Sequence, residues 1–469
     1  MAKTYKTPGT YIEEIVKLPP SVTQIDSSIP IFIGYTEKAS DGNKPLPTEL
    51  IDDILIVQAK RITSLIEYEL YFGKTKLQPI NVRVEENNAT LTGESEYKIT
   101  VSELSKTTFH NHMQMYFVNG GGPCFIISVG VEKTTIAPNN FLSGLKMAAR
   151  YDEPSLTVIP QVNSLLSLVD YGNVYVAALQ QAADLNDRFV IMDCYDDNPE
   201  NLRSQVGNIN LRYGAAYHPS LQVPYGLIYN TNDLVFDIII HKTDSKDVTS
   251  EGTFQLNNLP DSLQALIKAE IGKQFVTLPP CSTIAGIYAR TDNSRGVWKA
   301  PANVSLNWVA SLTKQITDDE QSNLNVDQTY GKSINAIKSF TGKGFLVWGA
   351  RTLAGNDNEW RYVPVQRFIT MIEQSSRKAT ASFAFEPNDS NTWVKIKAML
   401  ESFLTTLWRQ GAMQGVKPEQ AFYVRIGLNQ TMTNLDILEG RLIIEMGIAA
   451  VRPAEFIILK LSQKMKQTE

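Results

Sequence analysis

The chain has 469 residues, which is long enough for two or three domains, each with its own core. Hydrophobic residues make up 43% and charged residues 20%, and the mean hydropathy is -0.17; these values fit a folded globular protein and exclude a disordered or membrane-embedded one. The 44 basic and 49 acidic side chains give a net charge of -5 and are spread along the chain, so we expect no nucleic-acid partner.

Three cysteines, Cys124, Cys194 and Cys281, lie far apart without paired spacing. This pattern predicts reduced thiols in a protein made in a cytosol, and excludes a disulfide framework. No apolar run is long enough for a secretory signal or a membrane span, so we expect neither signal-peptide secretion nor membrane insertion.

Residues 1–28 are predicted to form an extended arm. A short strand-like patch at 11–16 is flanked by residues that interrupt regular structure, namely Pro8, Gly9, Pro19 and Pro20. Because so short a patch cannot bury its own apolar face, we expect the arm to pair with a partner.

The first part of a core is predicted at 29–130. Residues 29–35 (IPIFIGY) and 124–129 (CFIISV) are short apolar runs, which are typical of strands covered on both faces of a sheet. Residues 64–72 between them have helical spacing.

A β-rich surface insertion is predicted at about 76–108. Residues 80–84 and 97–101 alternate in polarity on either side of a polar segment that contains Thr92-Gly93-Glu94. This pattern is typical of a β-hairpin.

The middle region, 131–350, is predicted to be an α/β domain. Helical and strand patterns alternate along it, as in βαβ units: helix 141–151, strand 156–159, helix 174–186, strand 189–192 and further elements from 201 onward. A β-branched run at 234–240 and a polar stretch at 243–252 indicate a second insertion or extra strands, at about 225–275.

The C-terminal region, 351–469, is the most regular. Residues 360–376 and 391–410 each carry apolar side chains at helical spacing, and Gly411 is placed to end the second helix. Three strands are expected after it, at 422–426, 442–448 and 455–461. The last strand has no hairpin partner after it and is predicted to be an exposed edge.

Asp193, Asp196 and Asp197 form the best candidate for enzymatic chemistry. They follow the strand 189–192, and α/β sheets place ligand and metal sites at the carboxyl ends of strands. In a second interpretation, Asp196, Asp197 or Asn198 caps a helix that begins near Pro199. We favour capping, because no nearby histidine or lysine supplies a second catalytic role.

The other short motifs have structural interpretations. Gly331-Lys332-Ser333 lacks the earlier glycine of a phosphate-binding loop, and Asn119-Gly120-Gly121-Gly122 precedes a strand, so both are interpreted as turns. His110 and His112 would share one face of a strand, but no third ligand lies nearby, so we interpret them as surface histidines before a helix. Nucleophile and metal-hydrolase motifs are absent, so we expect no enzymatic activity, catalytic residue, cofactor or metal.

Five segments, in chain order, carry a family resemblance. They are residues 5–39 (YKTPGTYIEEI…PPSV…SSIPIFIGYTEKA), 213–221 (YGAAYHPSL), 297–303 (VWKAPAN), 342–367 (GKGFLVWGARTLAGNDNEWRYVPVQR) and 452–463 (RPAEFIILKLSQ). Over nearly the whole chain they resemble contractile tail sheath proteins of phages and phage-tail-like injection systems, and 348–367 is the most specific stretch. The chain departs from the family at the two insertions.

The resemblance implies a fold and a mechanism. The fold is mixed α/β: a layered α/β core, a C-terminal sheath domain, and β-rich surface insertions. Subunits stack as hexameric rings around an inner tube, and contraction of the sheath drives the tube through a target envelope without nucleotide. The implied partners are copies of the chain itself, the inner tube protein, and baseplate and cap proteins.

The resemblance also implies which residues link subunits. The N-terminal arm and C-terminal strand add to the sheet of neighbouring subunits (β-augmentation); the linking residues are Tyr11, Ile12, Glu13, Glu14 and Ile15 in the arm and Glu455, Phe456, Ile457, Ile458 and Leu459 in the strand. In the family a C-terminal helix faces the inner tube, here 391–410, with Lys395, Lys397 and Arg409 as candidate contacts. In the alternative interpretation these three side chains are the solvated face of an amphipathic helix.

Assembly in the cytoplasm is expected, followed by a place in a virion tail or in an extracellular or cell-anchored particle. Two other hypotheses remain open. One is a minor sheath paralogue at the baseplate or cap end of the sheath. The other is an enzyme with a metal site at Asp193–Asp197 or a nucleotide site at Lys332.

Overall fold

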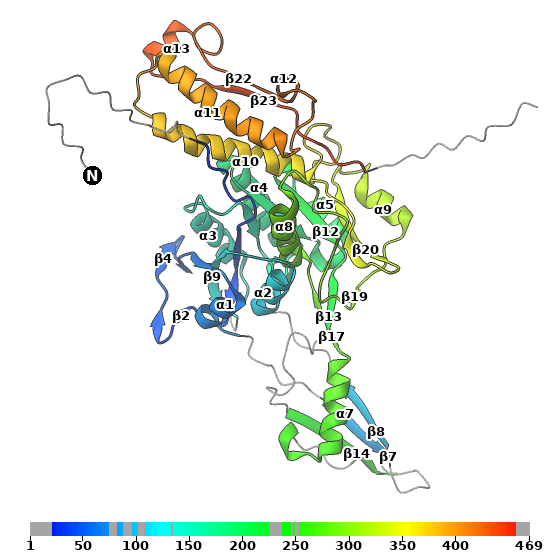
Figure 1. The fold of residues 1–469 in the computed structure, drawn as a ribbon. Helices are drawn as coiled ribbons and strands as arrows, with labels where there is room; N and C mark the ends of the chain where they lie inside the picture. Colours follow the sequence, from blue (N-terminus) through cyan, green and yellow to red (C-terminus); the bar gives the residue numbers. More distant parts are fainter. Residues whose placement is uncertain are drawn as a thin grey trace, which may run out of the picture. The chain divides into compact units, whose positions relative to one another are not determined.

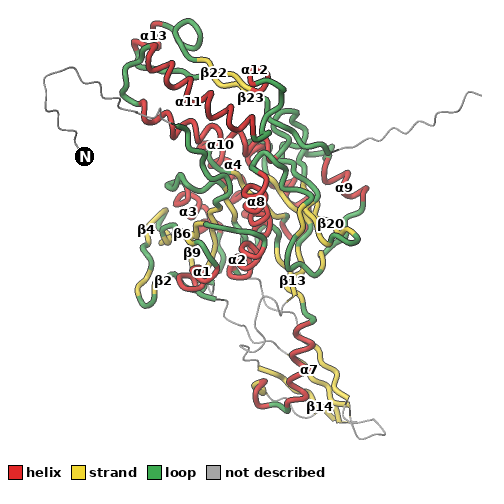
Figure 2. Tube along the Cα trace, viewed as in Figure 1, coloured by secondary structure: helices red, strands yellow, loops and turns green. Residues whose placement is uncertain are grey.

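The computed structural model describes residues 21–74, 82–87, 96–101, 108–132, 135–224, 237–244, 247–248 and 253–455. The chain forms two compact units, and the division between them falls within helix α10 (Val363–Thr380). One unit is formed by residues 372–451 with 21–25, and the other, the core unit, by residues 26–371 with 452–455. Figure 1 follows the chain through both units, and Figure 2 separates their helices from their strands.

A nine-stranded sheet forms the centre of the core unit, in the order β18-β21-β20-β12-β11-β10-β1-β9-β6. Six strands are parallel: β1 (Pro30–Thr36), β9 (Cys124–Val131), β10 (Leu156–Val158), β11 (Phe189–Asp193), β12 (Gly214–His218) and β20 (Ile334–Phe340). Antiparallel strands end the sheet on both sides: β6 (Lys60–Ile62), β21 (Gly344–Val347) and β18 (Val304–Ser305).

Both faces of this sheet are covered, as the apolar runs predicted. All seven residues of β1 are buried. Phe32 packs into a cluster with residues of α2 (Phe109–Val118) and α8 (Cys281–Arg295). Ile31 and Ile33 belong to a second cluster, with residues of α3 (Pro138–Ala148) and α4 (Leu168–Leu185). Successive side chains along a strand point to opposite faces of the sheet, so the two clusters lie on its two faces. The layered α/β prediction is therefore confirmed.

Short elements complete the core unit. The helices are α1 (Leu65–Phe72), which Ser64 caps, α5 (Pro199–Gln205) and α9 (Asp318–Asn325). The strands are β2 (Ser40–Asp41), β3 (Lys44–Pro45), β4 (Thr48–Ile51), β5 (Ile54–Val57), β13 (Leu221–Pro224), β17 (Phe275–Leu278) and β19 (Ser311–Leu312). All three cysteines are free and buried.

The two predicted insertions contribute to one sheet. Strands β7 (Val82–Asn87) and β8 (Glu96–Val101) form the expected antiparallel pair, and β7 also pairs in parallel with β14 (Asp237–Asp244). The elements β15 (Asp247–Val248), β16 (Thr253–Gln255) and α7 (Asp261–Gly272) complete the lobe, with α7 packed on β8 (Figure 1). The sequence predicted the hairpin and a strand in the second insertion, but not their pairing.

The C-terminal unit contains the predicted long helix, α11 (Ser390–Arg409), packed on β22 (Phe422–Arg425). Strand β22 pairs antiparallel with β23 (Glu445–Ile448), which is shorter than the predicted 442–448. The short helices are α12 (Pro418–Ala421) and α13 (Asn434–Leu438). The predicted helix 360–376 corresponds to α10, which begins at Val363 and continues to Thr380.

Candidate assembly surfaces

Helix α11 is built as its sequence predicts. Asp389 caps it, because its side chain accepts a hydrogen bond from the Thr392 backbone N–H at 2.9 Å. One face is buried, and it consists of Thr392, Ile396, Met399, Leu400, Phe403, Leu404 and Leu407. Gly411, with φ of 79°, follows the helix end in the left-handed region that glycine tolerates. The helix therefore presents one long face to the outside of its unit.

The three candidate tube contacts lie on two sides of that exposed face. At 3.6 residues per turn, Lys397 is about 200° around the helix from Lys395, whereas Arg409 is within about 40° of it. Lys395 and Arg409 are exposed, and Lys397 is half-buried and lies 3.8 Å from Glu401. The structure therefore groups Lys395 with Arg409 and separates Lys397 from them.

A groove of about 930 Å³ runs along α11 in the same unit. It is lined by Lys395, Ala398 and Ser402 of the helix and by Ser21 and Val22 of the N-terminal segment. The Ile25 backbone N–H also donates to the Ser375 hydroxyl at 3.1 Å. The described end of the N-terminal segment therefore runs over the helix that carries the candidate tube contacts.

The sheet of β22 and β23 has only two strands among the described residues. Val424 of β22 is buried, whereas Tyr423 is 43% exposed. A two-stranded sheet is marginally stable in water unless further strands or a helix cover it, and here α11 covers one face. Each strand keeps a second edge to which another strand could be added.

Glu455 is the only predicted C-terminal linking residue that the structure describes. It forms an ion pair with Arg351 of the core unit, at 2.5 Å between Nη2 and Oε2. Phe456, Ile457, Ile458 and Leu459 lie outside the described residues. The five predicted arm residues, Tyr11, Ile12, Glu13, Glu14 and Ile15, also lie outside them.

Asp193 ends β11 and supports a neighbouring helix. Its buried carboxylate accepts a hydrogen bond from the Cys281 backbone N–H at 2.7 Å, at the first residue of α8. Burial raises the pKa of Asp193 to about 7, although the hydrogen bonds from Cys281 lower it. A carboxylate that receives the first N–H of a helix satisfies one of the free donors at that helix end. This is a structural role.

The acidic residues after β11 also make structural contacts. Asn198 caps α5 by accepting from the Glu200 backbone N–H, which confirms the capping interpretation for that residue. Asp197 binds His218 at 3.0 Å and the Ser220 backbone N–H at 2.8 Å. Burial alone would raise the pKa of Asp197, but the hydrogen bonds from His218 and Thr313 hold it below its usual value.

Lys332 and the two histidines are also buried. Lys332 precedes β20, as the turn interpretation requires, and donates to the backbone oxygens of Arg203 and Val206. Burial lowers its pKa. The interpretation of His110 and His112 as surface residues was wrong, because both belong to helix α2 and their side chains are buried. Burial lowers the pKa of His112 to about 3, so this imidazole stays neutral.

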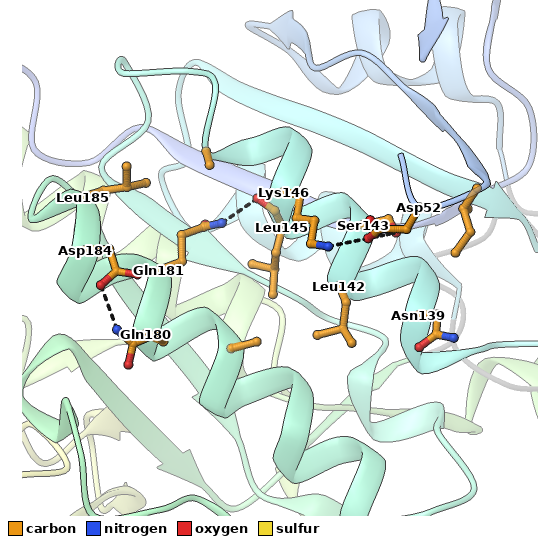
Figure 3. A pocket seen from close by; sticks show the side chains of 13 residues that line it. Asp52, Asn139, Leu142, Ser143, Leu145, Lys146, Gln180, Gln181, Asp184 and Leu185 are labelled. Atoms are coloured by element: carbon orange, nitrogen blue, oxygen red, sulfur yellow. Dashed lines mark hydrogen bonds and ion pairs between the residues drawn. The ribbon is translucent and has the colours of Figure 1, made fainter. Parts of the chain in front are cut away.

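A second groove, of about 700 Å³, lies between α3 and α4 (Figure 3). Two pairs of its polar side chains bind each other: Lys146 pairs with Asp52 at 2.5 Å, and Gln180 donates to Asp184 at 2.7 Å. No group of three potential metal ligands occurs among the residues that the structure describes. None of the described helices is long and apolar enough to cross a membrane.

Sequence reasoning missed the buried ion pairs of the core unit, among them Arg351 with Glu455 and Arg367 with Asp292. Both arginines lie in the segment 342–367. In sequence they resemble ordinary polar residues, and the only signal was that this segment carries the most specific family resemblance.

Comparison with known proteins gives a consistent result. Residues 355–464 match the model of the phage tail sheath C-terminal domain. The tail sheath protein of Vibrio phage KVP40 is 24% identical over 136 residues, which cover 29% of this chain and 20% of that protein. The matched segments therefore span about a fifth of the length of these curated relatives.

Solved structures match over the whole chain. A chain of the anti-feeding prophage helical sheath in the contracted state is 28% identical, with a TM-score of 0.67, and the match covers 98% of this chain and 100% of that one. A chain of the six-fold symmetrised anti-feeding prophage baseplate is 29% identical, with a TM-score of 0.65 and the same coverage.

Proposed function

We propose that this chain, a homologue of contractile tail sheath proteins, is a structural subunit of the sheath of a phage-tail-like injection system. Subunits polymerise as stacked hexameric rings around an inner tube, and contraction drives the tube through a target envelope. The observation that carries this proposal is the likeness to a contracted sheath chain over 98% of this chain, at 28% identity.

The linking mechanism in this proposal is strand addition. The two-stranded sheet of β22 and β23 has edges available for further strands, and the N-terminal arm and C-terminal strand of neighbouring subunits supply them. At about 1 kcal/mol net per main-chain hydrogen bond, a five-residue strand contributes a few kcal/mol per link. Neighbours then stay connected while the folded units rotate.

Contraction in this proposal needs no catalytic residue. The sheath assembles in a metastable extended state, and a difference of a few kcal/mol per subunit is summed over the tube. The interactions of Asp193, Asp197 and Lys332 support a non-enzymatic role, because each contributes to packing within the core unit. We therefore propose that the protein has no cofactor and is not an enzyme.

The proposed partners are copies of this chain, the inner tube protein, and baseplate and cap proteins. Assembly takes place in the cytoplasm, and the product is a virion tail or an extracellular or cell-anchored particle. A second candidate function is that of a minor sheath paralogue next to the baseplate. It is favoured by the 29% identity to a chain in a baseplate structure.

Electron microscopy of the purified full-length protein in negative stain tests the proposed role. We expect long tubes with a regular axial repeat, because a main sheath subunit carries every contact needed to add the next ring. Discrete rings that never lengthen would favour the baseplate paralogue. Particles that remain single subunits at every concentration and salt would contradict both functions.

We also propose that the exposed face of α11 contacts the inner tube, with Lys395 and Arg409 on one side of it. Reversing both charges (K395E with R409E) should weaken co-sedimentation of assembled sheath with purified tube protein by about tenfold at low salt, and less at high salt. K397E should have a smaller effect, because Lys397 already lies near Glu401. K343E, on an exposed turn of the core unit, is the control for added negative charge. Equal binding by all four proteins would exclude this face.

A further inference from the structure

We propose that two buried arginines, Arg351 and Arg367, fix the points at which the two linking arms leave the core unit. This inference rests on the proposed function and adds positioning residues to it. Both arginines belong to the segment 342–367. Each forms a two-point ion pair within the core unit, and each pair holds the chain next to a predicted arm.

Arg351 holds the C-terminal arm at Glu455. Its Nε lies 2.8 Å from Oε1 of Glu455 and its Nη2 lies 2.5 Å from Oε2. The Tyr362 hydroxyl donates to Oε2 at 3.2 Å, and Arg351 Nη1 donates to the Asn325 backbone oxygen at 3.0 Å. The Arg351 side chain is 4% exposed and that of Glu455 is 17% exposed. Residues predicted to link subunits follow directly after Glu455.

Arg367 holds the N-terminal arm at Ser27. Its two terminal nitrogens lie 3.1 and 2.5 Å from the Asp292 carboxylate oxygens, and Nη2 also donates to the Ser27 backbone oxygen at 2.7 Å. The Ser27 hydroxyl donates to the same carboxylate at 2.7 Å. The guanidinium group lies over the Tyr288 ring, 4.5 Å from its centre. Strand β1 begins three residues later, at Pro30.

The chemistry of these pairs favours a positioning role. A buried ion pair is weak support for stability, since the loss of hydration offsets the attraction and apolar residues can pack as well. A guanidinium group that binds a carboxylate at two points does fix direction, which a hydrophobic contact does not. The two pairs lie near the two places where the chain enters the core unit, after Ile25 and after Val451. One short segment of the chain therefore sets the starting points of both arms.

Loss of either pair should lower the stability of the core unit, because the remaining partner is a buried charge, but should leave the core folded and release the start of one arm. The linking strands would then approach neighbouring subunits over a range of directions. We therefore expect short or irregular tubes from a folded protein, and this combination separates a positioning role from a purely structural one.

The test at the C-terminal arm measures a distance in the unassembled full chain. Spin labels replace Lys343 and Ala454, both exposed and both in the core unit. With Glu455 present we expect one narrow distance, and with Glu455→Ala that single distance should be lost. Glu455→Gln keeps an acceptor oxygen and should restore part of it. An unchanged distribution in Glu455→Ala would overturn the proposal for this arm.

The second test compares tubes in negative stain. Arg367→Lys keeps a positive charge near Tyr288 but cannot bind Asp292 and Ser27 together, so it should lose the long regular tubes while circular dichroism shows a folded protein. Arg441→Lys, at an exposed pair with Asp436, is the matched control and should leave the tubes unchanged. Regular tubes from Arg367→Lys would overturn the N-terminal half of the proposal.

Failure of this inference is distinguishable from failure of the proposed function. If the unsubstituted protein forms no tubes but Glu455→Ala loses the narrow distance, the sheath role fails and Arg351 still positions Glu455. If the unsubstituted protein forms tubes and both variants match it, the sheath role stands and the arginines do not position the arms.

Discussion

Deletion of residues 1–20 should abolish long tubes without unfolding the core unit. The described part of the core unit begins after this segment, and the nine strands described in its sheet start with β1 at Pro30. If the arm supplies a strand to a neighbour, the deletion removes a few kcal/mol from every link in the lattice, at about 1 kcal/mol per hydrogen bond. Negative-stain microscopy should show rings or single subunits, with an unchanged thermal unfolding midpoint.

A pair of point variants refines this result. Ile12→Pro removes one main-chain donor from the predicted linking strand and should shorten the tubes, because proline cannot donate to a strand ladder. Ile12→Val keeps the donor and the β-branched side chain and should assemble normally. Tubes of normal length from both the deletion and Ile12→Pro would show that the arm does not link subunits.

Gly286→Ala should destabilise the core unit, although it adds only one methyl group. Gly286 lies in α8 where this helix crosses α2, and an added Cβ would lie 2.5 Å from the Tyr116 backbone oxygen and 3.1 Å from the Asn119 Cβ. The backbone oxygen cannot move as a flexible side chain can. Overpacking of this kind typically costs about 1–3 kcal/mol.

Gly272→Ala is the matched control, because it makes the same change in helix α7. An added Cβ there would meet no atom within 4 Å. Because Gly272 is the last residue of α7, alanine should stabilise this helix by less than the about 1 kcal/mol that glycine costs in a helix interior. Urea unfolding should give a lower midpoint for Gly286→Ala and an equal or higher one for Gly272→Ala. Two equal midpoints would mean that α2 and α8 can separate at little cost.

The sequence predicted best where a pattern was long or entirely apolar. Helix α11 has 20 residues with one buried face, and the predicted range, 391–410, differs from it by one residue at each end. Strands β1 and β9 are buried on both faces, so their apolar runs were sufficient. In these elements local pattern and tertiary environment agree.

Helix α2 shows why a local pattern can mislead. Seven of its ten residues are buried, because it lies against the sheet and α8, so no polar face reveals a helical period. Without that signal, the two-residue spacing of His110 and His112 resembles the alternation of side chains along a strand. Each finds a partner that is remote in sequence: His110 Nε2 lies 3.0 Å from Glu69, and His112 Nδ1 lies 3.4 Å from Ser282.

The strand pairing between the insertions and the buried ion pairs could not be predicted, because both depend on contacts between segments that are distant in sequence. Strand β7 pairs with β14, more than a hundred residues away, and neither sequence specifies the other as its partner. Arg351 and Arg367 are two of several arginines in a polar stretch, and only the fold places carboxylates beside them. Among the candidate site residues, the sequence identified the helix that carries Lys395 and Arg409, but not the separation of Lys397 from them.

The position of β1 within the core sheet has a mechanical consequence. This strand follows directly after the N-terminal arm and lies between two parallel neighbours, paired with β10 from Pro30 to Phe32 and with β9 from Ile31 to Gly34. If tension on the arm pulls β1 along its own axis, the hydrogen bonds on both sides of the strand are loaded in shear together. A strand at the edge of a sheet, pulled sideways, would instead lose its bonds one after another. If the N-terminal arm links subunits as proposed, tension on it would therefore reach a strand that is held on both sides.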